Sequence, residues 1–172
     1  MPVQPAVRDL LKRGHVPYQT FTHRLAYTAQ EEAAAAHVPG RDWAKTVACV
    51  ADGQAILAVL PAPLIINFEK LRRLVGSQRL RLATEEEMAR WYPGCELGAI
   101  PPLGPLYKQS VFVDRKLTQE TNIVFSAGTH TDSIRMPYAA FTTIAQPVVG
   151  DYGELPPSGN RSVAHDGHDL WT

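Results

Sequence analysis

Two apolar, β-prone runs follow each other closely in this sequence, and they constrain the fold more than any other feature. Residues 46–50 (TVACV) and 55–60 (AILAVL) are separated only by Ala51-Asp52-Gly53-Gln54. An Asp-Gly pair between two such runs is a typical signal for a tight β-hairpin. Because strands that are apolar on both sides are buried on both faces, the sequence predicts a hairpin of two central strands.

Helical and strand-like segments alternate around this hairpin. Capping residues mark the starts of three helices, at Thr28 with Glu31 three residues later, at Asn67 and at Thr84. Hairpin-joined strands interspersed with helices, without a regular βαβ repeat, predict an α+β domain with a mixed sheet. Two more helices are expected over residues 7–13 and 137–144, and further strands over residues 17–23, 79–82, 110–114, 122–127 and 132–136.

Composition indicates one domain followed by a tail. The chain has 172 residues, of which 45% are hydrophobic and 20% charged, so it suits a single globular domain, expected over residues 1–152. Residues 153–172 are rich in Pro, Gly, Ser, Asn and His and are expected to form a flexible tail. A metal site and a solvated segment are both open interpretations of the tail residues His165, Asp166, His168 and Asp169, and the composition favours the solvated segment.

Net charge and the absence of apolar segments limit the expected partners and location. The formal net charge is zero, so any binding to nucleic acid must use a local patch. No apolar run reaches transmembrane length, and the N-terminus lacks the apolar core of a signal peptide. We therefore expect a cytoplasmic protein with no membrane partner, in which Cys49 and Cys95 are free thiols.

A cluster of polar residues lies between two strand-like segments near residue 130. Gly128 is followed by Thr129, His130, Thr131, Asp132 and Ser133. A tight hairpin needs only two turn residues such as Asn-Gly, so this polar run exceeds what a turn requires. The run therefore predicts a site, and a loop of mutually satisfied polar groups is the alternative interpretation.

Two other features are candidates for binding an oxygen-rich ligand. Lys45 precedes the first apolar strand, where its ammonium could enter a pocket while its stem lies on apolar surface; the alternative is an ordinary surface lysine. The Pro/Gly-rich loop of residues 98–105 could present the backbone N–H groups of Gly98, Ala99 and Ile100 to a carbonyl oxygen. A simple connecting loop is the alternative there.

Together these residues resemble the YbaK/prolyl-tRNA-synthetase-associated domain family. That family includes free-standing trans-editing deacylases and the editing insertion domain of bacterial prolyl-tRNA synthetases. The resemblance covers residues 5–150 and implies an α+β fold with a mixed, partly closed β-sheet flanked by helices, and a pocket that hydrolyses the ester of a mischarged tRNA. It rests on motifs that occur in the family's order, namely Tyr27–Glu31, Lys45, Gly98–Pro102, Ala127–His130 and Ile134–Tyr138.

The resemblance also implies roles for individual residues. Lys45 corresponds to the lysine that contacts the terminal adenosine and helps to hold the ester, and Gly98 belongs to the loop that positions the ester carbonyl. His130 falls where family members vary with their substrate, so it either selects the aminoacyl group or orients water as a catalytic residue. The implied substrate-binding residues are Thr46, Ala99, Ile100, Pro101, Pro102, Gly128 and Thr129.

The reaction implied by the resemblance needs no metal and no cofactor. An aminoacyl ester is already activated, so a pocket that orients water and stabilises the carbonyl oxygen through backbone donors supplies much of the acceleration. Glycine and alanine near the expected pocket fit a small aminoacyl group, such as alanine, serine or cysteine. The implied partner is the acceptor end of an aminoacyl-tRNA, and an aminoacyl-tRNA synthetase is a candidate second partner.

Two rival hypotheses remain open from the sequence. In one, the fold is a catalytically inactive module that binds tRNA or a synthetase. In the other, Cys95 is a thiol nucleophile served by His130. If His130 selects the substrate, His130→Ala should change which aminoacyl group is cleaved more than the maximal rate. The contact patch of the binding module would be formed by Lys70, Arg72, Arg73, Arg79 and Arg81.

Overall fold

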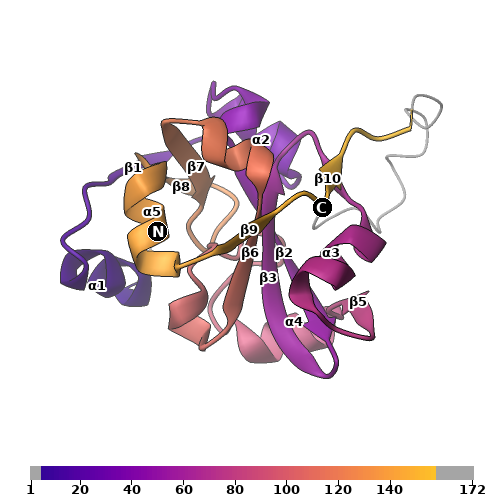
Figure 1. Ribbon diagram of the computed structural model, residues 1–172. Coiled ribbons are helices and arrows are strands. Elements are labelled where there is room, and N and C mark those ends of the chain that lie inside the picture. The colour runs from indigo at the N-terminus through magenta and orange to yellow at the C-terminus, as the bar shows by residue number, and fades with distance from the viewer. Residues whose placement is uncertain (1–4, 158–172) are drawn as a thin grey trace.

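The computed structural model describes residues 5–157, and Figure 1 shows strands packed between helices. The tail residues considered above as metal ligands, from His165 to Asp169, lie outside the described residues. The five α-helices of the described part are α1 (Pro5–Arg13), α2 (Ala29–Ala35), α3 (Phe68–Val75), α4 (Glu85–Trp91) and α5 (Tyr138–Ala145). Its strands are β1 (Gln19–Thr22), β2 (Ala44–Ala51), β3 (Gln54–Pro61), β4 (Ile65–Ile66), β5 (Leu80–Leu82), β6 (Ser110–Asp114), β7 (Asn122–Ser126), β8 (Asp132–Pro137), β9 (Val148–Gly150) and β10 (Gly153–Glu154).

The predicted central hairpin is confirmed by the pairing of β2 with β3. The two strands are antiparallel from Ala44 opposite Pro61 to Ala51 opposite Gln54, so Asp52 and Gly53 form the turn. On the outer side of this hairpin, β5 pairs with β2 in the antiparallel direction. On the other side, β6 is parallel to β3 and β9 is parallel to β6. The result is a mixed five-stranded sheet in the order β5-β2-β3-β6-β9.

A second sheet lies beside the first. It contains three antiparallel strands in the order β1-β8-β7, and an isolated parallel bridge between Trp43 and Val124 joins it to the chain that enters β2. A short pair of β4 and β10 forms a third sheet. The predicted α+β fold with a mixed sheet is therefore confirmed, and the strands do not close into a barrel.

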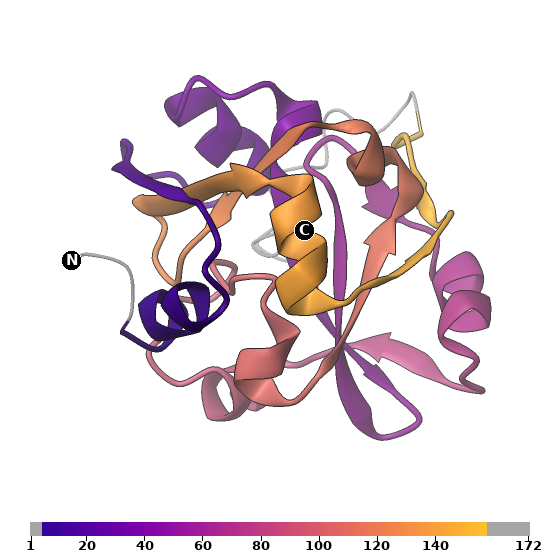
Figure 2. The ribbon, with the colours of Figure 1, turned by 60° about the vertical axis from the view of Figure 1, so that its left-hand side comes forward.

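Both faces of the five-stranded sheet are covered, as the apolar strands predict. Alternate residues of β2 and β3, such as Ala48 and Leu57, face a core shared with α1, α4, α5, β7 and β8. Figure 2 shows α5 crossing in front of the sheet on this side. Residues of the opposite parity, such as Cys49 and Ala58, face a second core shared with α3 and Tyr152. Burial on both faces explains why neither strand alternates between apolar and polar residues.

The predicted helix starts are confirmed by their caps. Thr28 Oγ1 accepts from the backbone N–H of Glu31 at 3.1 Å, and Asn67 Oδ1 accepts from that of Lys70 at 3.1 Å. Thr84 begins α4 with a complete capping box, because the side chains of Thr84 and Glu87 each accept from the other residue's backbone N–H. These side chains satisfy backbone donors that the first helical turn leaves without partners.

The end of the described chain is attached to the fold. Tyr152 is 1% exposed, and Gly153 and Glu154, which composition assigned to the tail, form β10 against β4. Cys49 and Cys95 are thiols that form no disulfide with each other, in agreement with the prediction. None of the helices within residues 5–157 has the length and apolar character needed to cross a membrane.

Candidate functional site

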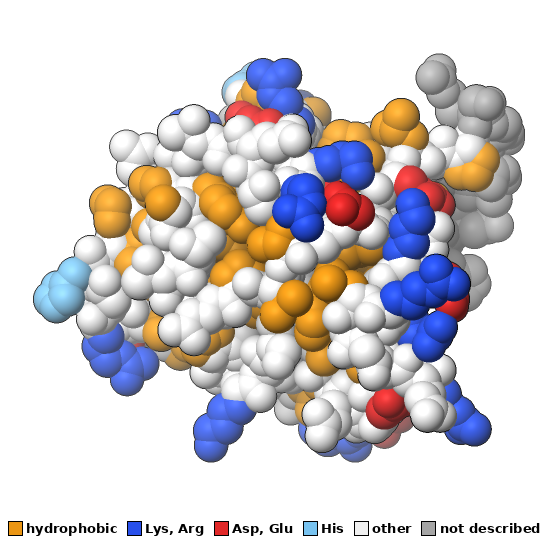
Figure 3. All heavy atoms as spheres, in the orientation of Figure 1, with side chains coloured by type: hydrophobic (Ala, Val, Ile, Leu, Met, Phe, Trp, Pro, Cys, Tyr) orange, Lys and Arg blue, Asp and Glu red, His pale blue; other side chains and the backbone are white. Residues whose placement is uncertain are grey.

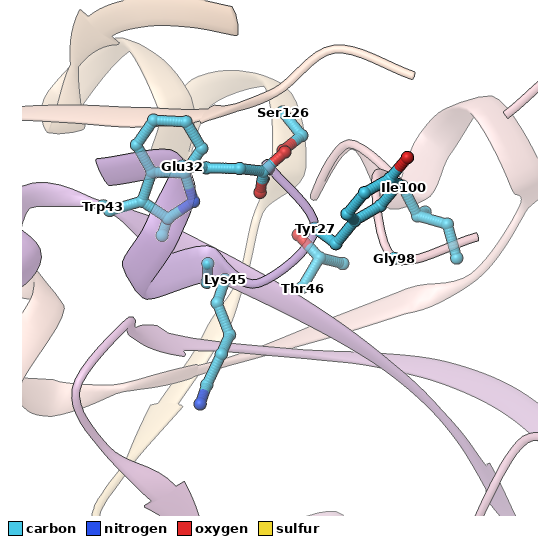
Figure 4. A pocket seen from close by; sticks show the side chains of 10 residues that line it. Tyr27, Glu32, Trp43, Lys45, Thr46, Gly98, Ile100 and Ser126 are labelled. Carbon is cyan, nitrogen blue, oxygen red and sulfur yellow. Dashed lines mark hydrogen bonds between the residues drawn. The ribbon is translucent and has the colours of Figure 1, made fainter. Parts of the chain in front are cut away.

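A small hollow lies where α2, the start of β2, the end of β7 and the loop around Gly98 meet. It leaves about 300 Å³ free of protein atoms, part of which is open to solvent. Figure 4 shows its lining side chains, with the Glu32 carboxylate pointing toward Ser126. The complete lining is Tyr27, Ala29, Glu32, Trp43, Ala44, Lys45, Thr46, Gly98, Ile100 and Ser126. The hollow thus brings together Lys45, Thr46, Gly98 and Ile100, four of the residues expected at the site.

Lys45 and Thr46 diverge from the start of β2. Successive side chains of a strand point to opposite faces, so Thr46 lies on the face of Ala44 and Ala48, and Lys45 on the face of Val47. Figure 4 shows the Lys45 side chain running away from the carboxylate of Glu32. Lys45 is only 6% exposed, so the interpretation as an ordinary surface lysine is wrong.

Thr46 contributes a polar group that has no protein partner among the described residues. Thr46 is 8% exposed, and its Oγ1 makes no hydrogen bond within residues 5–157. A buried hydroxyl without a partner carries a free-energy cost of about 1–3 kcal/mol. Its position on the wall of the hollow makes this hydroxyl available to a bound ligand.

The loop at Gly98 has a conformation that favours glycine. Gly98 has a φ of 83°, in the left-handed region that L side chains rarely adopt. Within the described residues, the N–H groups of Gly98 and Ile100 donate to no protein acceptor. The N–H of Ala99, in contrast, donates to Glu96 O at 3.0 Å. The expectation that Ala99 is a free donor is therefore wrong, because a turn within the loop uses its N–H.

Backbone hydrogen bonds tie this loop to the turn at Gly128. Gly128 N–H donates to Ala99 O at 2.9 Å, and Gly128 O accepts from Glu96 N–H at 2.8 Å. Gly128 has a φ of 101°, which again favours glycine. Pro101 and Pro102 are buried behind the loop and do not line the hollow. The two segments that the sequence singled out thus form one connected unit.

Thr129 stabilises its own turn instead of entering the hollow. Its hydroxyl donates a hydrogen bond to Asp132 Oδ2 at 2.7 Å. The same hydroxyl oxygen accepts a hydrogen bond from the backbone N–H of Asp132 at 3.0 Å. The N–H of Thr131 also donates to Thr129 Oγ1, at 3.3 Å. For Thr129 the geometry therefore favours the alternative interpretation, a loop whose polar groups satisfy one another.

His130 belongs to a buried network behind the hollow. Its Nδ1 lies 3.2 Å from Glu32 Oε1, and its Nε2 lies 2.5 Å from the carbonyl oxygen of Leu97. Ser126 Oγ donates to the Glu32 carboxylate, with both oxygens at 3.1 Å. The ring centroids of Tyr27 and His130 are 5.3 Å apart. His130 therefore connects α2 to the residue that precedes Gly98.

The network changes the protonation of both titratable members. Burial raises the pKa of Glu32, and hydrogen bonds from His130 and Ser126 oppose that effect only in part. Burial by itself lowers the pKa of His130, but the hydrogen bonds to Glu32 and to the Leu97 carbonyl outweigh it, so the pKa lies above its ordinary value of 6.5. Both shifts favour a proton held between the two side chains.

Sequence reasoning missed several residues of this site. Glu32 and Ser126 carry no motif of their own, because Glu32 reads as one more residue of a capped helix and Ser126 as the end of a strand. Trp43 lies just before the predicted strand, and its only signal is its size. Tyr27 was part of a matching motif, but nothing in the sequence indicated that its ring contacts His130.

The geometry opposes the thiol hypothesis. Cys95 Sγ lies 3.5 Å from Tyr107 Oη, whereas both ring nitrogens of His130 face Glu32 and Leu97. Burial raises the pKa of the Cys95 thiol, which is the opposite of what a thiolate nucleophile requires. Within residues 5–157, no three His, Cys, Asp or Glu side chains are grouped so that they could hold a metal ion.

Basic side chains gather at one edge of the molecule, beside α3. Figure 3 shows Lys and Arg side chains there with acidic groups among them. Arg72 and Arg73 both pair with Glu69, at 2.6 and 3.3 Å, and Arg81 pairs with Glu87 at 2.7 Å. Three of the five cations in the patch expected for a binding module are therefore held by carboxylates of the same surface.

Comparisons with known proteins give consistent matches. A family model described as an aminoacyl-tRNA editing domain matches residues 23–144. The chain is 32% identical over 102 residues to a proline–tRNA ligase of Nitratidesulfovibrio vulgaris (strain Hildenborough). The aligned residues cover 59% of this chain and 18% of that ligase. It is 33% identical over 109 residues to the proline–tRNA ligase of Streptococcus pyogenes serotype M1, covering 63% of this chain and 17% of the ligase. The chain thus matches less than a fifth of the length of these relatives.

Solved structures share the fold. A crystal structure of a candidate trans-editing enzyme for prolyl tRNA synthetase superposes with a TM-score of 0.74 at 24% identity, covering 88% of this chain and 99% of that chain. The hypothetical protein APE2540 superposes with a TM-score of 0.77 at 21% identity, covering 87% and 99%. At these identities the structural likeness demonstrates the fold.

Proposed function

Because the chain belongs to the aminoacyl-tRNA editing domain family, we propose that it is a trans-editing hydrolase that deacylates mischarged aminoacyl-tRNA carrying alanine, serine or cysteine. One observation carries the proposal beyond the family. The hollow at the start of β2 combines two backbone donors, of Gly98 and Ile100, with the Thr46 hydroxyl, and none of these three groups has a hydrogen-bond partner within residues 5–157. This set of groups suits a small ester better than a large or highly charged ligand.

The proposed reaction is hydrolysis of the ester that joins the amino acid to the terminal ribose. Water adds to the carbonyl carbon, the carbon–oxygen bond to the ribose breaks, and a proton returns to the ribose oxygen. The products are the free amino acid and uncharged tRNA. Backbone N–H groups that bind the carbonyl oxygen as it gains negative charge stabilise the transition state, and Gly98 and Ile100 supply such donors.

Lys45 is proposed to hold the tRNA end of the substrate. Its ammonium offers three donors to phosphate or ribose oxygens, and its position at the first residues of β2 puts it next to Thr46 and the hollow. The opposite directions of these two side chains support a division of roles. Lys45 would contact the nucleotide, and Thr46 would face the aminoacyl group.

Exclusion by size is the proposed basis of substrate choice. One methylene group changes binding in a pocket by only about 1–3 kcal/mol, so rejecting a larger amino acid is more effective than preferring a smaller one. Ala29, Ala44 and Gly98, which line the hollow, have small side chains or none. The match to proline–tRNA ligases makes tRNA specific for proline the first substrate to test, with the prolyl ester as the larger group to be rejected.

The test is a deacylation panel in which tRNA carries alanine, serine, cysteine or proline. The wild-type protein should release the three small amino acids and leave the prolyl ester intact. Lys45→Ala should abolish release while the circular dichroism spectrum shows that the protein stays folded. Lys12→Ala, which removes an exposed lysine from α1, should retain full activity.

Two results would contradict the proposal. Full deacylation by Lys45→Ala would remove the proposed role of that lysine. A wild-type protein that shifts the electrophoretic mobility of the charged tRNAs without hydrolysing any of them would instead support the binding module. The ion pairs within the basic patch beside α3 weigh against that alternative.

A further inference from the structure

Glu32 is a buried charged residue to which the proposed reaction assigns no role. It lies on α2, is 1% exposed, and has a carboxylate that contacts the ring of His130 and the hydroxyl of Ser126. Burying an unpaired carboxylate is costly. Burial of this carboxylate therefore lowers the stability of the protein unless its partners compensate, and a role in the site would explain why a carboxylate is present.

The two ring nitrogens of His130 define what that role can be. The carbonyl oxygen of Leu97 can only accept, so the His130 Nε2 that faces it carries a proton. On the other side, Nδ1 faces Glu32 Oε1. An unprotonated Nδ1 opposite an ionised carboxylate would bring two lone pairs together, so a proton lies between them. Glu32 therefore fixes both the orientation of the ring and its protonation.

We propose that Glu32 is a positioning residue of the editing site: it holds His130 so that Nε2–H binds the Leu97 carbonyl and fixes the loop that begins at Gly98. This inference rests on the proposed function, because the loop supplies the donors for the ester oxygen. The connection runs from α2 through the imidazole to the peptide that precedes Gly98. Ser126 satisfies the remaining acceptor capacity of the carboxylate from β7.

The charged surroundings of the pair favour the same arrangement. Glu96 accepts from the backbone N–H of His130 at 3.2 Å, and its negative charge adds to the rise in the pKa of His130. His23 approaches Glu32 from the segment after β1, and its positive charge when protonated lowers the pKa of Glu32. The Tyr27 ring packs against the imidazole at a tilted angle. The pair is thus expected to share a proton below the raised pKa of His130 and to lose it as the pH rises through that pKa.

The direct test is an NMR titration of the histidine rings, in which the His130 signals are assigned by their loss in His130→Asn. In the wild type, His130 should titrate above 6.5, the ordinary histidine value. In Glu32→Gln, an uncharged variant of the same shape, it should titrate at a lower pH than in the wild type, because the interaction with the carboxylate that raises its pKa is lost. Glu31→Gln, which changes the exposed neighbour on α2, should leave the His130 titration unchanged.

Deacylation assays test whether the pair acts on the loop. Glu32→Gln should slow release of the small amino acids by about tenfold or more, the scale on which a misplaced catalytic group lowers a rate, and should change their relative rates as His130→Ala does. Because Glu32 acts through His130, the double variant that combines Glu32→Gln with His130→Ala should be no slower than the slower of these two single variants. Glu31→Gln should match the wild type.

The outcomes separate this inference from the proposed function. A wild-type His130 that titrates at or below 6.5 overturns the pairing without any variant. Losses that multiply in the double variant overturn the action of Glu32 through His130. If the wild type hydrolyses no aminoacyl-tRNA, the proposed function fails and with it the role of Glu32 in editing, while the ring titration still decides whether the two side chains are paired.

Discussion

At the scale of single residues, Gly98 links backbone conformation to the proposed chemistry. Its φ of 83° places it in the left-handed region, and a Cβ there costs about 1–2 kcal/mol. The N–H groups of Gly98 and Ile100 in this loop make no hydrogen bond within residues 5–157. A side chain at Gly98 would therefore disturb the wall of the hollow as well as the backbone.

We expect Gly98→Ala to lower the free energy of unfolding by about 1–2 kcal/mol and to lower the deacylation rate by about tenfold or more. Gly94→Ala is the matched control, because Gly94 also has a φ of 83° and lies outside the lining of the hollow. Chemical denaturation and deacylation assays should show similar stability losses for both variants. Equal loss of activity in both would assign the effect to backbone strain alone.

At the scale of secondary-structure elements, one buried carboxylate attaches the C-terminal strand. Asp114, at the end of β6, is fully buried and accepts from the backbone N–H groups of Lys116, Tyr152 and Gly153 at 2.9, 3.0 and 2.5 Å. Tyr152 adds a hydroxyl that lies 2.8 Å from Val59 O and 2.7 Å from Phe112 O. These contacts explain why the ordered chain continues past residue 152.

Asp114→Ala should therefore destabilise the protein by about 3 kcal/mol, because it leaves three backbone donors without their charged acceptor. The measurement is the free energy of unfolding in urea, with hydrogen exchange of the Tyr152 and Gly153 amides as a local readout. Asp151→Ala removes an exposed carboxylate from the same segment, which pairs with Arg115, and should change stability little. A comparable loss in both variants would contradict the role of Asp114.

Elements differed in how well the sequence predicted them. Strands and helices of five or more residues were found where periodicity and caps placed them, as with α4 between Thr84 and Pro93. The short strands β4, β9 and β10 were not predicted, since two or three residues show little periodicity; among strands of this length only β5 was predicted, within residues 79–82. Their pairing depends on partners elsewhere in the chain, such as the contact of β9 with β6.

At the scale of the whole molecule, ionisable groups set two limits on stability. Hydrogen bonds from Arg72 and from Arg81 lower the pKa values of Glu69 and Glu87 to about 2. Backbone hydrogen bonds from Gln78 and Arg79 lower the pKa of Asp52. A lowered pKa contributes stability that is complete above the ordinary value and is lost as the pH falls toward the lowered one. These groups therefore support the fold above about pH 4.5 and lose their contribution toward pH 2.

The buried pair of Glu32 and His130 has the opposite pH dependence, because its contribution to stability is lost as the pH rises. The pKa of His130 is raised in the folded protein, so its contribution is complete below 6.5 and is lost as the pH rises through the raised value. Unfolding midpoints measured from pH 2 to pH 9 should thus fall at both ends. Glu87→Gln should reduce only the fall of the unfolding midpoint at acid pH, and Glu32→Gln should reduce only its fall at alkaline pH.

Controls separate these effects from general charge. Glu85→Gln alters an exposed carboxylate on the same helix as Glu87 and should preserve the acid side. High salt should reduce the pH dependence of the unfolding midpoint more at acid pH, where the ion pairs are exposed, than at alkaline pH, where the pair of Glu32 and His130 is buried. An acid limb that is the same in wild type and Glu87→Gln would contradict the contribution of the Arg81 pair.

The sequence by itself determined the central hairpin and the capped helices, because each depends on residues that are close in the chain. The α+β class and the family resemblance followed from the order of these elements and motifs along the chain. Periodicity and capping act over a few positions, so they can be read without the fold. It also identified the loop at Gly98 and the turn at Gly128 as candidate parts of one site. It did not determine that their backbones bond directly to each other.

Only the tertiary structure decided what His130 does. Glu32 is 98 positions from His130 and 94 from Ser126, and neither pair forms a motif. Their contacts exist because α2 packs against the end of β7, and the cost of burying a carboxylate is met only when partners from distant segments meet it there. A hydrogen-bond network of this kind depends on three-dimensional distance, which residue order does not encode locally.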